Sequence, residues 1–594
     1  MAKHLWWWVA ILACATVSMP SQGHKLPPLA IAQQSDGTEP TAREKLGEPD
    51  IVVSGLINKK KGPWKRAEAE HVIVIAQNSV DELRRITRNV ESLHYLLSRL
   101  YRRGDTSDVT KKVEITLFDP STKLSDLGIA DISAKSGYYP SGFSSPAYYI
   151  AGENGPILTI VQKYQLIELN TQKAYNEECD DRHADGQIGP CPEPSYFPIV
   201  REWEAELYAL YTQHFISTYH PLVYPSWYVE SIGALFSTAD IHKNGSINYA
   251  RYPTQYKQFF RSYENLNFAD ILTGKYITIG REKSRWTPYH AWLVAHYFVY
   301  SKLKPERGVQ FRQYMGDISR GKPMAEAANV FGNFSKLQRE ILSYSRSDFY
   351  FAQAKPPANP IGEPVITPLS PAAAALIAAK IELGARLAAQ PIAAGSALPA
   401  PTLVDAQRSV DWLARVRGVA DLYSDGDTLA FAAEAECRAG NADRCLAYAE
   451  RALDKAPNNV LALTWKGVAL TDKAVSAPVA NQPATLALAR MAIQRAIALD
   501  GQLPLPRIAY FQSFTKLGER VPMDAMAGLV DAIRRVPAAP KPRLYLGEEL
   551  VRQGEMEAAR QVLHTVLYAP YESPERTAAR ALFAMPPTGA GSGN

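Results

Sequence analysis

Three side chains that could bind a metal ion lie close together in the chain: His214, His220 and Glu230. Imidazole nitrogens and carboxylate oxygens are zinc ligands, and a catalytic zinc usually takes three protein ligands and a water. The two histidines are six residues apart, so they do not share one face of a continuous helix. Pro221 predicts that the helix ends just after them. The two histidines are therefore only candidate ligands, and the pattern favours a core position for each.

Residues 225–231, PSWYVES, contain Glu230 in a recognisable setting. The segment resembles the P-x-W-x-x-E-G motif of gluzincin-type zinc metallopeptidases, in particular secreted bacterial proteins that join such a domain to tetratricopeptide repeats. In that family the Glu of this motif is the third zinc ligand, and an H-E-x-x-H motif on the preceding helix supplies the rest. The two histidines share a helix face because they are four residues apart, and the Glu between them polarises the zinc-bound water. Here Ser231 replaces the Gly.

The first motif of the family is absent from this chain. Alignment places Ala209 and Gln213 at the two histidine positions and Leu210 at the catalytic Glu, with Gln213 seventeen positions before Glu230. Leu210 fits the apolar stripe of a helix, where an active enzyme needs a carboxylate. Since one carboxylate cannot hold a catalytic zinc, the sequence predicts no catalytic residue and no cofactor, with Glu230 as a vestigial ligand position.

The elements that must position these residues form an α+β domain. The apolar run 71–77 predicts a strand, and Ser79 followed by Glu82 predicts the start of a helix that runs to about residue 102. Residues 112–118 alternate as a strand does, and 147–152 with 155–161 predict a hairpin, which together suggest a small antiparallel sheet. A helical subdomain rich in aromatic residues follows, and its rings and histidines, including His290 and His296, favour core positions.

The resemblance and the composition together divide the chain into five parts. They are a signal peptide with an uncertain cleavage site (1–32), a polar segment (33–69), a degenerate gluzincin-like domain (70–355), a Pro- and Ala-rich linker with one helix (356–404) and an all-α solenoid (405–590). Proline density defines the linker, since six prolines occur between residues 356 and 371.

The solenoid is predicted from an internal repeat over about residues 415–585. Its first unit has the large, small, turn-glycine, small and closing-proline positions of the 34-residue tetratricopeptide pattern at Leu429, Ala433, Gly440, Ala452 and Pro457. Three further units repeat this pattern with drift. The region resembles the tetratricopeptide family, and because one helix pair cannot bury its own apolar face, stacking into a solenoid is expected.

Export is predicted from the start of the chain. Residues 5–17, LWWWVAILACATV, are apolar and end before Pro20, which gives a segment too short for a spanning helix but typical of a signal peptide. A bacterial periplasmic or secreted protein is expected. A lipobox-like sequence would attach a lipid to Cys14, and only that lipid or an uncleaved signal would place the protein on a membrane.

The remaining cysteines agree with export, since they form two close pairs, Cys179 with Cys191 and Cys437 with Cys445. We expect two local disulfides. Zinc binding by the same four cysteines is the alternative, but neither pair has the C-x2-C spacing of a zinc knuckle.

Charge bears on the partner. The 594 residues include 65 Lys and Arg against 60 Asp and Glu, a net charge of +5, which argues against nucleic acid as a partner.

Three functions are consistent with these features. The favoured one is an exported, non-catalytic pseudopeptidase that binds a protein or peptide through the concave face of its repeats and a vestigial cleft. The alternative is an active zinc-dependent peptidase that uses His214, His220 and Glu230 as unconventional ligands. The third is a structural cell-envelope protein whose first domain only supports the repeats.

Overall fold

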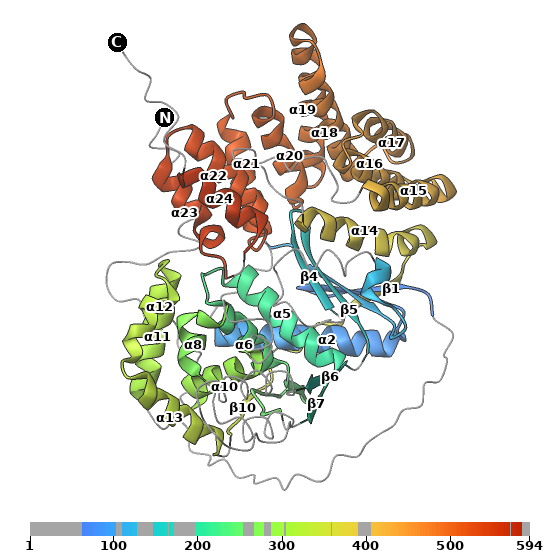
Figure 1. Cartoon of the computed structure of the whole chain (residues 1–594). Coiled ribbons are helices and arrows are strands. Elements are labelled where there is room, and N and C mark those ends of the chain that lie inside the picture. The colour runs from blue at the N-terminus through green and yellow to red at the C-terminus, as the bar shows by residue number, and fades with distance from the viewer. Residues whose placement is uncertain are drawn as a thin grey trace, which may run out of the picture.

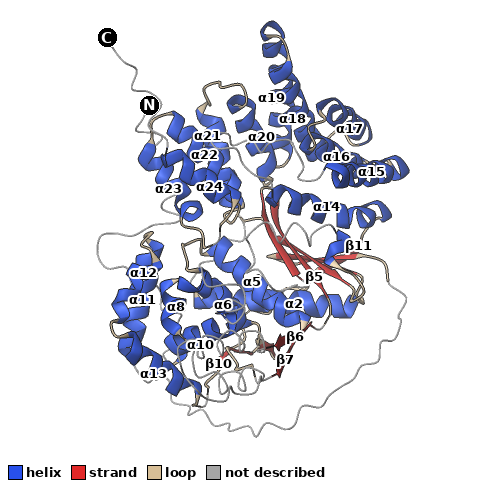
Figure 2. Ribbon diagram, in the orientation of Figure 1, coloured by secondary structure: helices blue, strands red, loops and turns tan. Residues whose placement is uncertain are grey.

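The computed structural model describes the chain from residue 62 to residue 584, with gaps. The described residues are 62–101, 110–127, 147–163, 165–170, 196–253, 267–277, 287–301, 305–347, 349–357, 359–389, 406–570 and 572–584. The predicted signal peptide, Cys14, most of the polar segment 33–69, and the pair Cys179 and Cys191 lie outside them. A mixed sheet with helices forms the N-terminal part, and a curved array of helices forms the C-terminal part (Figures 1 and 2).

A six-stranded sheet is the centre of the N-terminal part, with strand order β11-β1-β2-β3-β5-β4. The strands are β1 (Lys65–Glu68), β2 (Val72–Ala76), β3 (Val113–Phe118), β4 (Ala147–Gly152), β5 (Gly155–Val161) and β11 (Val365–Pro368). Strand β2 pairs in parallel with β3, and β3 pairs in parallel with β5, whereas the other neighbours are antiparallel.

The antiparallel sheet expected from the sequence is therefore wrong, because the sheet is mixed. Helix α2 (Val80–Leu100) lies between β2 and β3 and carries the chain back to the edge where β2 began, so the two strands run in the same direction. Ser79 caps α2, since its hydroxyl accepts the amide of Glu82 at 3.2 Å, as the sequence predicts. The hairpin β4–β5 is also as predicted.

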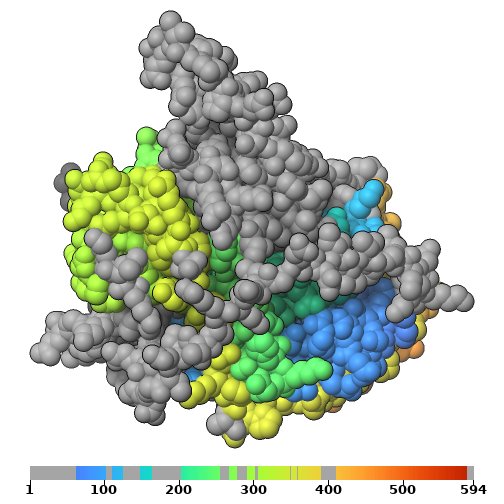
Figure 3. Space-filling view, turned by 90° about the horizontal axis from the view of Figure 1, so that it is seen from below, coloured from blue at the N-terminus to red at the C-terminus, as the bar shows by residue number. Residues whose placement is uncertain are grey.

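Helices cover the first face of the sheet and extend away from it. They are α5 (Trp203–Tyr219), α6 (Ser226–Phe236), α8 (Phe268–Thr273), α10 (Thr287–Tyr300), α11 (Pro305–Ser319), α12 (Met324–Ala327) and α13 (Phe334–Ser345). The aromatic rings of this subdomain are buried, as expected: Trp227, Trp292 and Tyr211 are each 0% exposed. From below, α2 lies on one side of this part and α11 on the other (Figure 3).

Short elements complete the N-terminal part. Strands β6 (Gln165–Asn170) and β7 (Tyr196–Arg201) form a two-stranded sheet, and β8 (Asp240–Ile241), β9 (Ile247–Tyr249) and β10 (Ala352–Ala354) form a three-stranded one. Single 3-10 turns are η1 (Leu124–Leu127), η2 (Lys275–Ile277) and η3 (Ala328–Phe331).

The segment predicted as a linker, residues 356–404, takes part in the fold. Residues 365–368 form β11, which pairs with β1 at the edge of the sheet, and β1 itself lies in the predicted polar segment 33–69. Helix α14 (Pro371–Ala389), the one helix expected here, packs on the second face of the sheet: its Ile377 and Ile381 share a buried cluster with strand residues. The Pro-rich stretch thus adds a strand rather than only joining two domains.

The C-terminal array is built from antiparallel helix pairs. Its helices are α15 (Ala406–Tyr423), α16 (Gly426–Arg438), α17 (Ala442–Lys455), α18 (Val460–Ser476), α19 (Gln482–Leu499), α20 (Pro504–Thr515), α21 (Met523–Arg535), α22 (Pro540–Arg552), α23 (Met556–Leu567) and α24 (Pro574–Ala584), with η4 (Val479–Asn481) between α18 and α19. The predicted turn glycine Gly440 has a φ of 81°, and Gly518 and Gly554, in turns between later helices, have φ of 68° and 81°, a region that favours glycine.

Small residues let the two helices of a pair touch. An added Cβ on Gly467 of α18 would lie 2.3 Å from Cγ1 of Ile493 and 2.8 Å from the carbonyl oxygen of Ala489, both on α19. Gly547 of α22 meets Leu563 of α23 in the same way, at 2.5 Å. The glycine in the first helix of these repeats is therefore required by close packing.

In the described part of the chain, no helix is both long and apolar enough to span a membrane.

The glycine packing gives a stability prediction. We expect Gly467→Ala to lower the free energy of unfolding by about 1–3 kcal/mol, because the methyl group overpacks the α18–α19 contact. Gly418→Ala is the matched control, since Gly418 is exposed on α15 and its added Cβ would meet no described atom within 4 Å. That change should raise the free energy of unfolding by up to about 1 kcal/mol. Urea denaturation measures both, and equal effects of the two variants would contradict the packing.

Candidate functional site

Helices α5 and α6 hold the residues that the sequence singled out. Ala209, Leu210 and Gln213 lie on α5, and Glu230 lies on α6. The two helices approach closely at Gly233, where an added Cβ would be 3.0 Å from the carbonyl oxygen of Ala209 and 3.1 Å from Nε2 of Gln213. Leu210 is 3% exposed and belongs to the apolar core. The positions aligned with the catalytic motif are thus occupied by helix packing.

Glu230 lies one turn before this contact, partly buried, near the hydroxyl of Tyr276. Burial, together with the negative charge of Glu230, raises the pKa of Tyr276 well above its usual value. The Tyr276 hydroxyl also shares a hydrogen bond with Oγ of Ser226, the first residue of α6. A neutral tyrosine therefore neighbours the carboxylate.

His214 is a core residue, as the sequence favoured. Its side chain is 0% exposed, and its Nδ1 lies 3.0 Å from the hydroxyl of Tyr149 on β4 and 3.2 Å from Oγ1 of Thr218. Burial lowers the pKa of His214 to about 3, so the imidazole is neutral at ordinary pH. It connects α5 to the sheet.

His220 contacts a different group of residues from His214. It follows the last residue of α5, its Nδ1 pairs with the hydroxyl of Tyr224, and its ring lies 5.2 Å from that of Tyr101. Among the residues that the structure describes, no three His, Cys, Asp or Glu side chains converge as a metal site would require. His214, His220 and Glu230 are not brought together.

The second histidine pair, on α10, is also buried. Nδ1 of His296 lies 2.7 Å from the hydroxyl of Tyr344, and its Nε2 lies 3.1 Å from the carbonyl oxygen of Tyr350. Burial lowers the pKa of His296 to about 4 and that of His290 to about 3. Both belong to the aromatic core of the helical subdomain.

A buried polar cluster that sequence reasoning missed joins β2, α2 and α5. The carboxylate of Glu91 accepts the backbone amides of His71 at 2.7 Å and Val72 at 3.2 Å, and it lies 2.7 Å from Nδ1 of His71. The ring of His94 stacks on that of His71 with centroids 3.6 Å apart, and its Nδ1 lies 2.8 Å from the hydroxyl of Tyr211. The sequence signal that could have revealed this cluster is the pair Glu91 and His94, two polar residues that interrupt the apolar face of α2.

The inner face of the helix array contains a second polar cluster, which holds the tip of the β4–β5 hairpin. The hydroxyl of Tyr545 on α22 donates to Oε1 of Glu153 at 2.6 Å, and Nη2 of Arg438, the last residue of α16, donates to Oε2 at 3.1 Å. The ammonium of Lys541 lies in the same cluster and donates to the carbonyl oxygen of Leu387 at the end of α14. We call Arg438, Lys541 and Tyr545 the carboxylate clamp.

Electrostatics in the clamp favour an anion. Burial alone would raise the pKa of Glu153, but the charges of Arg438 and Lys541 and the hydrogen bonds from Tyr545 and Arg438 outweigh it, so the pKa lies below its usual value. Burial lowers the pKa of Lys541 and raises that of Tyr545. The clamp therefore holds an ionised carboxylate.

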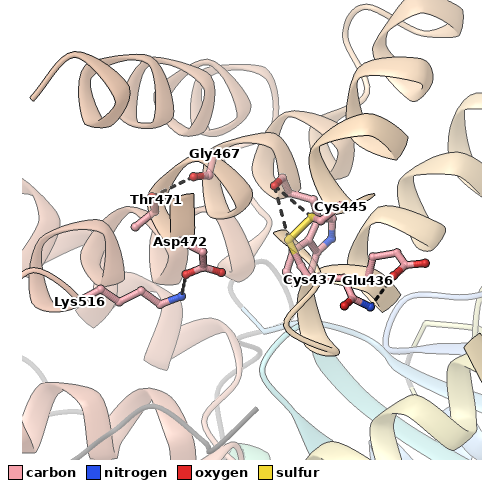
Figure 4. Close-up of a disulfide and its surroundings, with 9 residues drawn as sticks. Glu436, Cys437, Cys445, Gly467, Thr471, Asp472 and Lys516 are labelled. Atoms are coloured by element: carbon pink, nitrogen blue, oxygen red, sulfur yellow. Dashed lines mark hydrogen bonds and ion pairs between the residues drawn. A yellow bond between two sulfur atoms is a disulfide. The ribbon is translucent and has the colours of Figure 1, made fainter. Parts of the chain in front are cut away.

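A disulfide braces the helix pair next to the clamp. Sγ of Cys437 and Sγ of Cys445 are 2.01 Å apart and join the end of α16 to the start of α17, across the turn at Gly440 (Figure 4). This is the second of the two predicted pairs. The bond lies beside Arg438, whose guanidinium stacks over the ring of Trp465 at 5.1 Å.

Comparison with known proteins gives a distant structural similarity. No protein-family model and no curated protein matches the chain. A solved thermophilic TPR protein of Thermus thermophilus is 17% identical over 30% of this chain and 92% of its own, with a TM-score of 0.28.

The polar core of the N-terminal part gives a second stability prediction. We expect Glu91→Ala to lower the free energy of unfolding by roughly 3 kcal/mol or more, because it removes the acceptor of two buried amides and an imidazole. The matched control is Glu70→Ala, since Glu70 is exposed and directly precedes His71, and its change should stay within about 0.5 kcal/mol. Thermal and urea unfolding measure both. A loss at Glu91 no larger than that at Glu70 would show that the cluster contributes nothing.

Proposed function

We propose that the chain is an exported, non-catalytic binding protein whose tetratricopeptide-like helix pairs dock a protein partner. The observation that carries this proposal is the array itself, which exposes apolar side chains on an outer helix. On α19, Leu488 is 53% exposed, Met491 61% and Leu499 44%. Their spacing of three and eight residues puts them on one face of the helix. Exposed apolar stripes of this kind are typical of protein contact surfaces.

The absence of catalysis is inferred from the first domain. An enzyme of the resembled class needs two histidines and a carboxylate at positions 209, 213 and 210, and this chain has Ala, Gln and Leu there. The close approach of α5 and α6 at Gly233 supports this inference, because the backbone and side chain of α5 fill the space beside the glycine. A location in the cell envelope is supported by the apolar segment 5–17 and by the paired cysteines.

Partner capture tests the binding function. The natural protein and the double variant Leu488→Glu, Met491→Glu are each immobilised and exposed to an extract of the cells that produce the protein. We expect quantitative mass spectrometry to find a specific protein on the natural chain and at least tenfold less of it on the variant. Charges on the stripe oppose burial against an apolar partner. Leu422→Glu is the matched control, since Leu422 is 73% exposed on α15, outside the stripe, and it should capture as the natural protein does. Identical capture by all three proteins would overturn the proposal.

The metal content of the protein tests the proposed absence of catalysis. We expect the natural protein to contain no stoichiometric zinc and the variant Ala209→His, Leu210→Glu, Gln213→His to bind one zinc per chain, lost again when Glu230→Ala is added. Native mass spectrometry measures this, and a thermal melt checks that each variant is folded. Stoichiometric zinc in the natural protein, lost in His214→Ala, would instead support the active peptidase with unconventional ligands.

A further inference from the structure

We infer that the carboxylate clamp is a binding site for an acidic peptide segment of the protein partner, and that Glu153 occupies it as an internal substitute. This inference rests on the proposed binding function and names the chemistry that the inner face recognises. It is carried by the way two distant repeats converge on a single carboxylate.

The clamp is assembled by the array as a whole. Arg438 ends α16 and Tyr545 lies on α22, more than one hundred residues later, yet each donates to one oxygen of the same Glu153 side chain. Lys541 lies one helical turn before Tyr545 and adds a positive charge. Two donors and a cation around one carboxylate form an acidic-residue site, since charge-assisted hydrogen bonds are the stronger ones.

Glu153 does not use the clamp fully. Arginine binds a carboxylate best through two parallel N–H donors, but only Nη2 of Arg438 contacts Glu153. The Nε of Arg438 is buried and has no hydrogen-bond partner among the described residues. A carboxylate placed to accept from both nitrogens would therefore bind more favourably than Glu153 does.

A like charge also opposes Glu153. Glu434 lies one turn before Arg438 on α16, and burial together with the charge of Glu153 raises its pKa. Two carboxylates thus share the one guanidinium, with Lys380 as a further cation near Glu434.

The hairpin presents Glu153 in a way that allows exchange. Gly152 pairs with Gly155, so Glu153 and Asn154 form the turn at the end of two paired strands, and Asn154 is exposed. Withdrawal of the Glu153 side chain breaks no strand pair. The hairpin tip at the array (Figure 1) is therefore a replaceable ligand rather than a part of the repeats.

Peptide binding to the full chain tests the inference. The probe is a fluorescent peptide with the sequence of residues 151–156, AGENGP, and its control is the same peptide with Gln in place of Glu. In fluorescence anisotropy we expect the Glu153→Gln protein to bind the Glu peptide about tenfold more tightly than the natural protein, in which the tethered Glu153 competes at a high effective concentration. The Gln peptide should bind at least tenfold more weakly than the Glu peptide.

A second variant identifies the site. Adding Arg438→Met to Glu153→Gln should abolish binding of the Glu peptide, and circular dichroism with thermal melting checks that both proteins are folded. The inference is overturned if the folded Glu153→Gln protein binds neither peptide or binds both equally, since the cluster would then be a fixed tie between hairpin and array. If the α19 stripe still controls partner capture in that case, the binding function stands and only the acidic-peptide site falls.

Discussion

Helix α14 is the joint on which the rest of the structure depends, because it is buried on two sides at once. Ile377, Ile381 and Ala385 pack on the sheet, whereas Leu376, Ala379 and Leu383, three and four residues apart, pack on α15 and α16. A helix that is apolar nearly all round must be covered on all sides. Polar contacts fix its register: Glu382, 4% exposed, binds Arg386 on its own helix and Arg415 on α15. Helix α14 therefore joins the sheet to the first helices of the array.

Packing between α5 and α6 accounts for the residues found at the positions that align with the catalytic motif. An enzyme must keep a water-filled, polar space between the helix with its histidines and the helix with its third ligand, and it must hold that space open against collapse. In this chain Gly233 lets α6 approach the Ala209 and Gln213 edge of α5. Three of the buried ionisable groups, Glu91, His94 and His214, connect helices to strands and to tyrosine hydroxyls. Polar side chains inside this domain thus contribute to its structure.

How far the sequence predicted the structure depends on the range over which each signal acts. Local signals were reliable: the cap at Ser79, the β4–β5 turn and the glycine turns of the repeats are determined by neighbouring residues. The direction of the strands was not predicted correctly, because the parallel pairing of β2 with β3 depends on where α2 packs. Prolines around β11 suggested a linker, although a strand at the edge of a sheet tolerates them. The clamp could not be predicted from the sequence, since Glu153, Arg438 and Tyr545 are each more than one hundred residues from the others and have no motif around them.

Helix α14 and the carboxylate clamp are connected, and this connection bears on how a partner can bind the inner face of the array. The ammonium of Lys541 donates to the last turn of α14 through the carbonyl oxygen of Leu387, so α22 is tied to the same helix that packs on the sheet. The β4–β5 hairpin belongs to that sheet and ends at Glu153. A ligand that displaces Glu153 therefore contacts α16 and α22 of the array and releases a side chain of the first domain. Under the proposed function, this linkage gives the N-terminal domain a physical role, because its sheet supplies the carboxylate of Glu153 that competes for the clamp. The strength of that competition sets the affinity that an acidic segment of the partner needs in order to displace Glu153.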